Sequence, residues 1–321
     1  MTVSRVAGVG KSLLQAVSTV LVGKEARVGL LLCALFARRH VLLEDAPGTG
    51  KTTLVKSLAR AIGGSFARMQ FTPDLLPTDV TGFNAYDPRS GEFRFREGPV
   101  FSQFLLVDEI NRASPKTQAA LLECMEERQV SVDGVTYVLP DPFLVLATQN
   151  PVEYEGTFPL PEAQLDRFGV RVALGYPDRD EEVALLDRFL AADPLAEVSP
   201  VCTIDDVVAA QQECRGIHVD ISVKQYAVDI CAATRRHAEV TLGASPRATL
   251  ALTALAQAHA ALDGRDYVLP DDIKTLAPWC LSHRIVLAPA ARWREQTAEA
   301  IITGVLRGVP VPTLPAAGRH P

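Results

Sequence analysis

The sequence lacks the features that mark several classes of protein. It has no basic excess, since 32 lysines and arginines stand against 38 acidic residues and the formal net charge is −6. A dedicated nucleic-acid-binding protein usually carries a surplus of positive charge. The longest apolar run, Val28 to Ala37, is far shorter than the roughly 20 residues that cross a bilayer. The N-terminus shows no apolar stretch that ends in a small-residue cleavage site. We therefore expect a cytoplasmic protein with no membrane segment and no nucleic-acid partner.

Metal-binding and redox motifs are also absent from the sequence. The six cysteines stand singly with no C-x-x-C pair, and no histidine belongs to an H-E-x-x-H motif. Cys33, Cys124 and Cys231 lie in apolar surroundings, where a reduced and buried thiol is the expected role. We expect neither disulfide bonds nor a structural zinc site.

The chain divides into two parts by pattern. Residues 1–176 alternate strand-like and helix-like stretches, which is typical of an α/β layered fold. Continuous runs typical of a buried parallel sheet predict strands at His40–Glu44, Phe104–Val107 and Phe143–Ala147. Two β-hairpins are predicted at about 83–96 and 130–138. Helical periods predict a smaller, all-helical domain over residues 177–309, and residues 310–321 are predicted to form a loose tail.

A phosphate-binding loop follows the first predicted strand and precedes a helix. Backbone N–H groups at a helix N-terminus cradle a polyphosphate, and a glycine-rich loop lets them approach it closely. Lys51 would bring its charge to the β- and γ-phosphates, and Thr52 would offer its hydroxyl to Mg²⁺. The predicted ATP-binding residues are Pro47, Gly48, Thr49, Gly50, Lys51, Thr52 and Thr53. The alternative is a glycine turn with an unrelated lysine.

One position departs from the G-x-x-x-x-G-K-[ST] pattern, because Asp45 occupies the place of its first glycine. Aspartate tolerates a left-handed backbone better than most residues do, so the loop can still form. Its carboxylate would repel phosphates, so we expect it to point away from them or to bind a partner.

A pair of acids indicates that the nucleotide is hydrolysed. Asp108 and Glu109 follow the strand that begins at Phe104. Asp108 would hold Mg²⁺, and Glu109 would orient or deprotonate the attacking water. The absence of an N-K-x-D motif argues against a GTPase. The alternative is an acidic pair at the start of a helix.

Three further residues are candidates for the hydrolytic site. Asn150 ends the third strand, where it could reach the γ-phosphate and the water, although a turn asparagine before Pro151 is the simpler interpretation. Arg167 could act on a phosphate or could only pair with Asp166. Arg247 lies in the first turn of a predicted helix, where the helix dipole disfavours a cation. An anionic partner would explain Arg247, and a carboxylate could serve as well as a phosphate.

With these residues in place, the sequence closely resembles the MoxR family of AAA+ ATPases over nearly the whole chain. The most specific segments of the resemblance are Val107–Ala113, Ala120–Arg128, Ala147–Pro151, Pro159–Phe168, Gly243–Arg247 and Gly264–Tyr267.

The resemblance implies an αβα core with a parallel sheet and a helical lid. It makes Lys51 and Thr52 the Walker A residues and Asp108 and Glu109 the Walker B pair. It also implies that Asn150 is sensor 1, Arg167 the arginine finger and Arg247 sensor 2. The two hairpins match the helix-2 insert and the hairpin before sensor 1.

The resemblance also implies function and partners. Members of the family are ring oligomers, commonly hexamers, and act as chaperone-like ATPases on client proteins, often with a von Willebrand A-domain partner. ATP and Mg²⁺ are the expected ligands. The alternatives are a magnesium-chelatase-like ATPase subunit, a helicase-like motor, against which the acidic balance argues, and a nucleotide-gated scaffold with negligible turnover, to which only Asp45 points.

Overall fold

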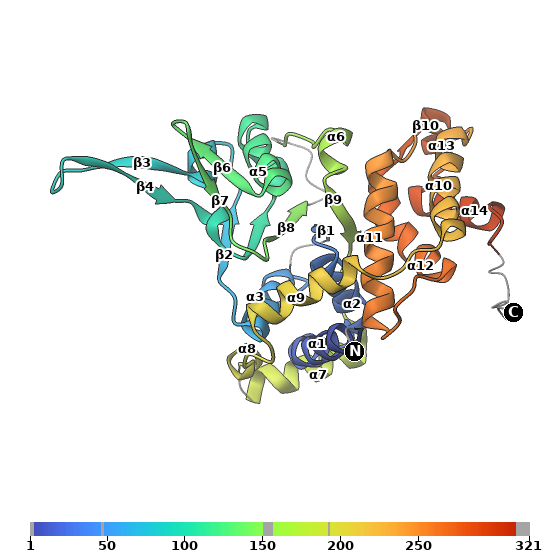
Figure 1. Ribbon diagram of the computed structural model, residues 1–321, viewed down its shortest axis with the longest axis horizontal. Helices are drawn as coiled ribbons and strands as arrows, with labels where there is room; N and C mark the ends of the chain where they lie inside the picture. Colours follow the sequence, from blue (N-terminus) through green and yellow to red (C-terminus); the bar gives the residue numbers. More distant parts are fainter. Residues whose placement is uncertain (1–2, 46–47, 150–156, 192, 313–321) are drawn as a thin grey trace, which may run out of the picture.

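A five-stranded parallel sheet lies at the centre of the protein, in the order β2-β5-β8-β1-β9 (Figure 1). The computed structural model describes residues 3–45, 48–149, 157–191 and 193–312. The strands of the sheet are β1 His40–Glu44, β2 Phe66–Gln70, β5 Phe104–Asp108, β8 Leu144–Gln149 and β9 Phe168–Val172. The α/β prediction is confirmed, and the three predicted strands are β1, β5 and β8.

The sheet is buried on both faces, and alternate residues of each strand enter different clusters. In β5, Phe104 and Leu106 pack into one hydrophobic cluster, while Leu105 and Val107 pack into the other. Because both clusters exclude water, these strands are apolar along their length, which is why the sequence reveals them. In the inner strands β1, β5 and β8, polar side chains are left to the two ends.

Helices cover both faces of the sheet. Those before β9 are α1 Val3–Ser18, α2 Glu25–Phe36, α3 Lys51–Ile62, α4 Pro77–Thr81, α5 Pro115–Glu127 and α6 Glu162–Leu165. The cluster on one face includes α1, α2 and α3, and the cluster on the other includes α5. Ser114 caps α5 by accepting a hydrogen bond from the Thr117 amide, and Pro115 occupies the first position of the helix.

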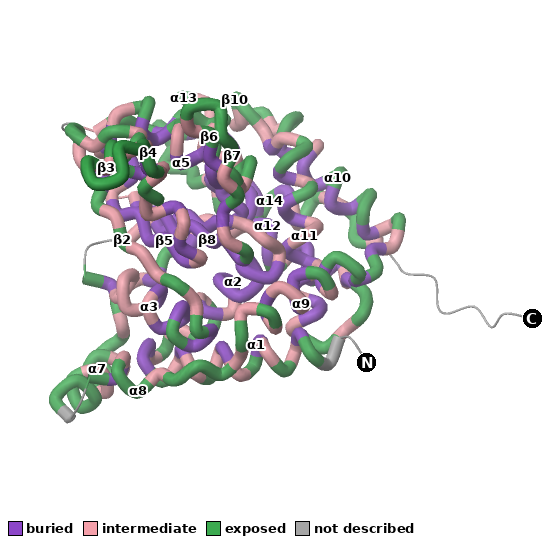
Figure 2. The backbone as a smooth tube through the Cα atoms, turned by 60° about the vertical axis from the view of Figure 1, so that its left-hand side comes forward, coloured by how far each residue is buried: buried purple, intermediate pink, exposed green. Residues whose placement is uncertain are grey.

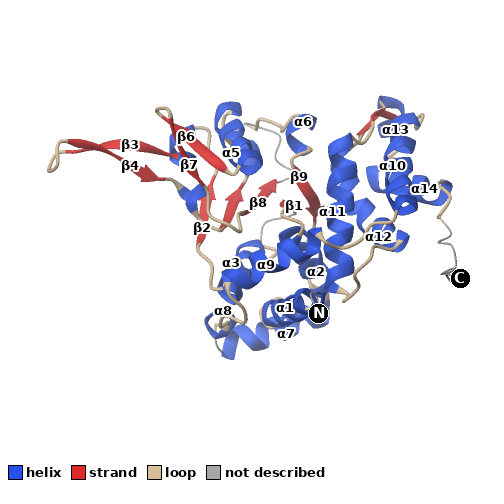
Figure 3. Ribbon diagram, in the orientation of Figure 1, coloured by secondary structure: helices blue, strands red, loops and turns tan. Residues whose placement is uncertain are grey.

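The two predicted hairpins are present and contact each other. They consist of β3 Gly82–Asp87 with β4 Glu92–Glu97, and of β6 Gln129–Val132 with β7 Val135–Val138. Phe95 stacks on Tyr137 with 4.0 Å between ring centroids. Asn84 also donates a hydrogen bond to Asp133 across the two hairpins. Figure 3 shows the β3–β4 hairpin projecting away from the sheet.

The chain beyond β9 is mainly helical. Its helices are α7 Arg179–Ala191, α8 Pro194–Glu197, α9 Ile204–Arg215, α10 Ile221–Arg236, α11 Pro246–Leu262, α12 Pro270–Leu281, α13 Pro289–Trp293 and α14 Ala298–Gly308. It also contains the antiparallel strands β10 Val240–Leu242 and β11 Val286–Leu287, so the all-helical prediction misses one small sheet. Strands of two and three residues are too short to show a period of two. The predicted tail lies largely outside the described residues.

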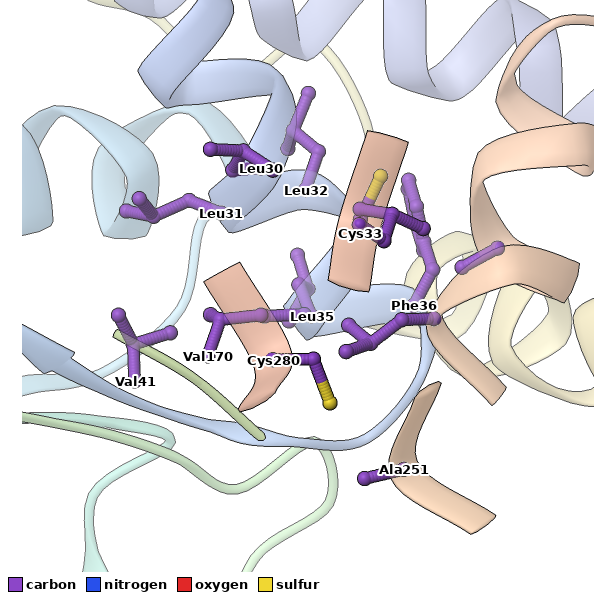
Figure 4. Close-up of a cluster of buried hydrophobic side chains, with 14 of the residues drawn as sticks. Leu30, Leu31, Leu32, Cys33, Leu35, Phe36, Val41, Val170, Ala251 and Cys280 are labelled. Atoms are coloured by element: carbon purple, nitrogen blue, oxygen red, sulfur yellow. The ribbon is translucent and has the colours of Figure 1, made fainter. Parts of the chain in front are cut away.

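One continuous hydrophobic cluster joins the sheet to the later helices. Leu35 of α2, Val41 of β1 and Val170 of β9 belong to the same cluster as Ala251 of α11 and Cys280 of α12 (Figure 4). Figure 2 shows most of α2 as buried, in contrast to the exposed β3–β4 hairpin. All six cysteines are free, as predicted. Among the described helices, none is both long and apolar enough to cross a membrane.

A buried ion pair reinforces this junction. Arg284, whose side chain is 2% exposed, donates from Nε to Asp166 Oδ1 at 2.7 Å. Its other nitrogens donate to backbone carbonyls, including those of Phe168 and Gly169 at the start of β9. The guanidinium therefore ties the segment after α12 to the first residues of an edge strand.

We predict that Arg284→Met lowers the free energy of unfolding by about 3 kcal/mol, because it leaves a partly buried carboxylate and several carbonyls without their donor. Urea denaturation would measure this change. The matched control is Arg294→Met, since Arg294 is 71% exposed and lies 3.4 Å from Glu239. It should change stability by less than about 1 kcal/mol. Equal effects of the two substitutions would contradict the structural role of Arg284.

Candidate nucleotide-binding site

The glycine loop and α3 form a cradle at the C-terminal end of β1. Gly48 and Gly50 have φ angles of +83° and +87°, a backbone conformation that other residues rarely adopt. The helix begins at Lys51, whose Nζ donates to the backbone carbonyl of Asp45 at 3.1 Å. A cavity of about 390 Å³ opens here, lined in part by Lys51, Thr52 and Thr53. Pro47 lies outside the described residues.

Asp45 has the partner that its position requires. Its carboxylate Oδ2 accepts hydrogen bonds from the backbone amides of Leu174 at 2.8 Å and Gly175 at 2.9 Å. These amides follow β9, so the aspartate links the loop to the neighbouring strand. Its negative charge is thereby satisfied by two N–H donors of the protein itself.

The acidic pair lies across the cavity from the loop, at the end of β5. Asp108 is the last residue of the strand, and Glu109 adopts a left-handed conformation with φ +56°. The Glu109 amide donates to Thr148 Oγ1 at 2.9 Å, and that hydroxyl lies 3.4 Å from Asp108 Oδ1. Thr148 thus fixes the backbone that carries both acids, and both line the same cavity as Lys51.

Residues that the sequence does not single out bind the two acids directly. Arg68 Nε donates to Asp108 Oδ2 at 2.7 Å, and Gln70 Nε2 donates to Glu109 Oε2 at 2.7 Å. Arg112 also donates to Glu109 Oε2, at 2.8 Å. Arg68 and Gln70 belong to β2, an edge strand that is only half buried and has no apolar run. Their spacing of two residues, which directs both to one face, is the only signal in the sequence.

The donor set fits a magnesium ion bound with a nucleotide. The Thr52 hydroxyl and the Asp108 carboxylate line one cavity, and oxygen ligands of this kind are those that Mg²⁺ prefers. Arg68 occupies one carboxylate oxygen, but its side chain is 53% exposed and can turn towards solvent. Asn150, the predicted sensor, lies outside the described residues.

The two predicted arginines lie at the opposite end of the sheet from the loop. Arg167 immediately precedes β9, and the first residue of β9 pairs with His40, the first residue of β1. The four steps from His40 to Glu44 span about 13 Å. Arg247 lies beside Arg167, and neither lines the cavity that holds Lys51. Arg247, predicted as sensor 2, therefore does not reach the glycine loop of its own chain.

Glu126 holds both arginines. Arg167 Nε lies 3.2 Å from Glu126 Oε2, and Arg247 lies 2.5 Å from Glu126 Oε1. The anionic partner that Arg247 requires is therefore, within this chain, a carboxylate. Asp166, the alternative partner of Arg167, instead binds Arg284 and accepts a hydrogen bond from Ser245.

Comparison with known families agrees with this architecture. Residues 40–170 match the family described as "ATPase family associated with various cellular activities (AAA)". Residues 232–305 match the family described as "AAA lid domain". The first match contains the glycine loop and the acidic pair, and the second contains Arg247.

Individual relatives extend over almost the whole chain. "Chaperone MoxR1" of Mycobacterium tuberculosis is 42% identical over 94% of this chain and 81% of its own length. "Protein MoxR" of Paracoccus denitrificans is 35% identical over 92% and 94% of the two chains. The "Uncharacterized protein YeaC" of Bacillus subtilis is 51% identical over 94% and 95%. The crystal structure of a "putative ATPase" from Cytophaga hutchinsonii superposes with a TM-score of 0.91 at 39% identity, covering 97% of each chain. The chain belongs to the MoxR family of AAA ATPases.

Proposed function

We propose that this protein is a Mg²⁺-dependent ATPase that forms rings, commonly hexamers in its family, and couples hydrolysis at subunit interfaces to the remodelling, assembly or activation of client proteins. The observation that carries this proposal is the division of the charged residues between the two ends of one sheet. Lys51, Asp108 and Glu109 line a cavity at one end, while Arg167 and Arg247 lie together at the other. A second copy of the chain would bring the two sets together.

At the glycine loop, the amides at the start of α3 and the charge of Lys51 would bind the phosphates. Thr52 and Asp108 would hold Mg²⁺, which, when bound, neutralises charge on the phosphate oxygens. Glu109 would orient or deprotonate the lytic water. Asn150 would contact the γ-phosphate, as the family resemblance implies.

Two donors hold the carboxylate of Glu109 in place. Gln70 and Arg112 both donate to its Oε2. Neither of them binds Oε1, the oxygen through which Glu109 would orient or deprotonate the lytic water.

Arg167 and Arg247 would act on the nucleotide of the neighbouring subunit. Both would exchange the carboxylate of Glu126 for the γ-phosphate. An arginine supplied in this way is worth roughly 10³ to 10⁵ in kcat in P-loop enzymes. An isolated subunit would consequently hydrolyse ATP slowly.

The β3–β4 hairpin would contact clients or a von Willebrand A-domain partner. Phe93 at its projecting end is 71% exposed and lies 5.5 Å from Tyr86, ring centroid to ring centroid. A magnesium-chelatase-like subunit would use the same ATPase apparatus. A scaffold with negligible turnover loses its main support, because the carboxylate of Asp45 is bound by backbone amides.

We expect Glu109→Gln to bind ATP but to release phosphate at least about 100-fold more slowly, because it lacks the catalytic carboxylate. Binding of a fluorescent ATP analogue and a phosphate-release assay would measure the two properties separately. Lys51→Ala is the contrasting variant and should lose binding itself. Normal turnover by Glu109→Gln would rule out its role as the base.

Mixing two inactive variants tests whether Arg167 acts on the neighbouring subunit. In rings containing both Arg167→Ala and Lys51→Ala, some interfaces pair an intact loop with an intact arginine, so phosphate release should partly recover. The control replaces Lys51→Ala by the double variant Lys51→Ala/Arg167→Ala, which offers no such interface. Recovery in the control, or none in either mixture, would contradict the arrangement.

Arg68→Gln should lower the Mg²⁺ concentration required for half-maximal nucleotide binding by about threefold. The reason is that a cation no longer competes for Asp108, and exposed pairs of this kind are worth up to about 1 kcal/mol. Titration of Mg²⁺ against a bound fluorescent nucleotide measures this without turnover. Arg96→Gln, an exposed arginine of β4 that does not line the cavity, is the control. An increased Mg²⁺ requirement in Arg68→Gln would show that Arg68 assists the ion instead.

A further inference from the structure

A second cavity, of about 220 Å³, lies where the core meets the later helices. Among the described residues, four arginines and no acidic residue line it. Arg38 and Arg39 follow α2, Arg128 directly follows α5, and Arg215 lies in the last turn of α9. We call it the arginine cavity. It adjoins the face that carries Arg167 and Arg247, but neither of those two residues lines it.

The positive charge of the arginine cavity is not balanced within the described chain. In the part of the chain that the structure describes, Asp141 is the one carboxylate bound to these arginines, 2.9 Å from Arg38 and 3.8 Å from Arg128. Four cations and one anion leave three positive charges. The nearby acids Glu126 and Asp166 are already bound to Arg167, Arg247 and Arg284 in ion pairs.

Arg39 shows most clearly that these guanidinium groups lack an anionic partner. Among the described residues it has no ion-pair partner and no side-chain hydrogen bond, and its Nε is buried without an acceptor. Burial, followed by the charges of other arginines, lowers the pKa of Arg39. Its neighbour Arg128 shows the same effect, because burial and the charge of Arg38 lower its pKa to about 10. An anion in the cavity would relieve this mutual repulsion.

A simpler explanation accounts for only part of this arrangement. The four arginines lie at the C-terminal ends of three helices, α2, α5 and α9, where the helix dipole favours a cation. That attraction is weak and confined to the last turn. It does not supply an acceptor for a buried Nε. Arg38 and Arg128 also adopt left-handed conformations, with φ of +55° and +53°, at positions where glycine is preferred. Both positions thus keep an arginine although its backbone is strained there, which indicates a functional requirement for the two guanidinium groups.

We propose that the arginine cavity binds a phosphate-class oxyanion and that this anion links the core to the later helices. Guanidinium groups match the oxygens of phosphate by paired hydrogen bonds. A phosphate group carries a charge of about −1.5 to −2 at neutral pH. It therefore balances more of the three excess positive charges of the arginine cavity than a single carboxylate would. The cavity has the volume of about seven water molecules, which admits a hydrated phosphate and excludes a folded acidic segment.

The first test uses inorganic phosphate and nucleotide-free protein carrying Lys51→Ala, which removes the phosphate-binding lysine of the glycine loop. Isothermal titration and thermal shift, compared with chloride at equal ionic strength, should detect phosphate binding. Adding Arg39→Met, which keeps much of the aliphatic stem, should weaken this binding at least tenfold. Absence of phosphate binding by the Lys51→Ala protein would overturn the proposal.

A second pair of variants keeps the test decisive if Arg39→Met fails to fold. Arg215 and Arg236 are both exposed arginines in the last turn of a helix, but only Arg215 lines the cavity. Arg215→Gln should weaken phosphate binding at least tenfold and Arg236→Gln should not. Equal affinity in these two variants would overturn the proposal.

The source of the phosphate group is settled by competition. If ADP or ATP displaces phosphate from the Lys51→Ala protein, the cavity takes the terminal phosphate of a nucleotide. If neither nucleotide displaces it, the cavity takes free phosphate. Because the assay contains no turnover and no functional glycine loop, its failure would leave the proposed ATPase untouched.

Discussion

A parallel sheet buried on both faces constrains everything else in this protein. Its inner strands β1, β5 and β8 carry apolar side chains along their length, so their polar groups collect at the two ends. The loop, Asp108 and Glu109 gather at the C-terminal end, and Arg167 precedes β9 at the other. A strand of five residues therefore separates the two halves of the charged apparatus. The proposal that another copy of the chain completes the site rests on this separation.

The charged groups at both ends already have counter-charges of their own. Asp108 pairs with Arg68, and Glu126 pairs with Arg167 and Arg247. When metal and phosphate bind, Asp108 would exchange Arg68 for the metal, and the two arginines would exchange Glu126 for phosphate. No ion would be left unpaired in a half-buried site, where it is costly. Such an exchange needs little net free energy, so small changes in geometry can decide which partner is bound.

Physical reasons explain what could be read from the sequence. The buried strands and the glycine loop each leave a local pattern, and each was predictable. The edge strand β2 is half exposed and has no apolar run, so Arg68 and Gln70 gave no comparable signal. The pairing of Arg247 with Glu126 joins residues 121 positions apart, and only the fold brings them together. Asp45 was recognisable as a departure, but its amide partners after β9 were not.

The cluster that joins α2, β1 and β9 to α11 and α12 has a mechanical consequence. Domains that swing freely are usually connected through small, polar interfaces, whereas here the packing is continuous and apolar. Opening it would expose several side chains with less than a tenth of their surface in water. Each subunit should accordingly behave as one stiff body. In the proposed ring, neighbouring subunits would rotate against each other as rigid bodies. The later helices of one subunit would not close onto its own core.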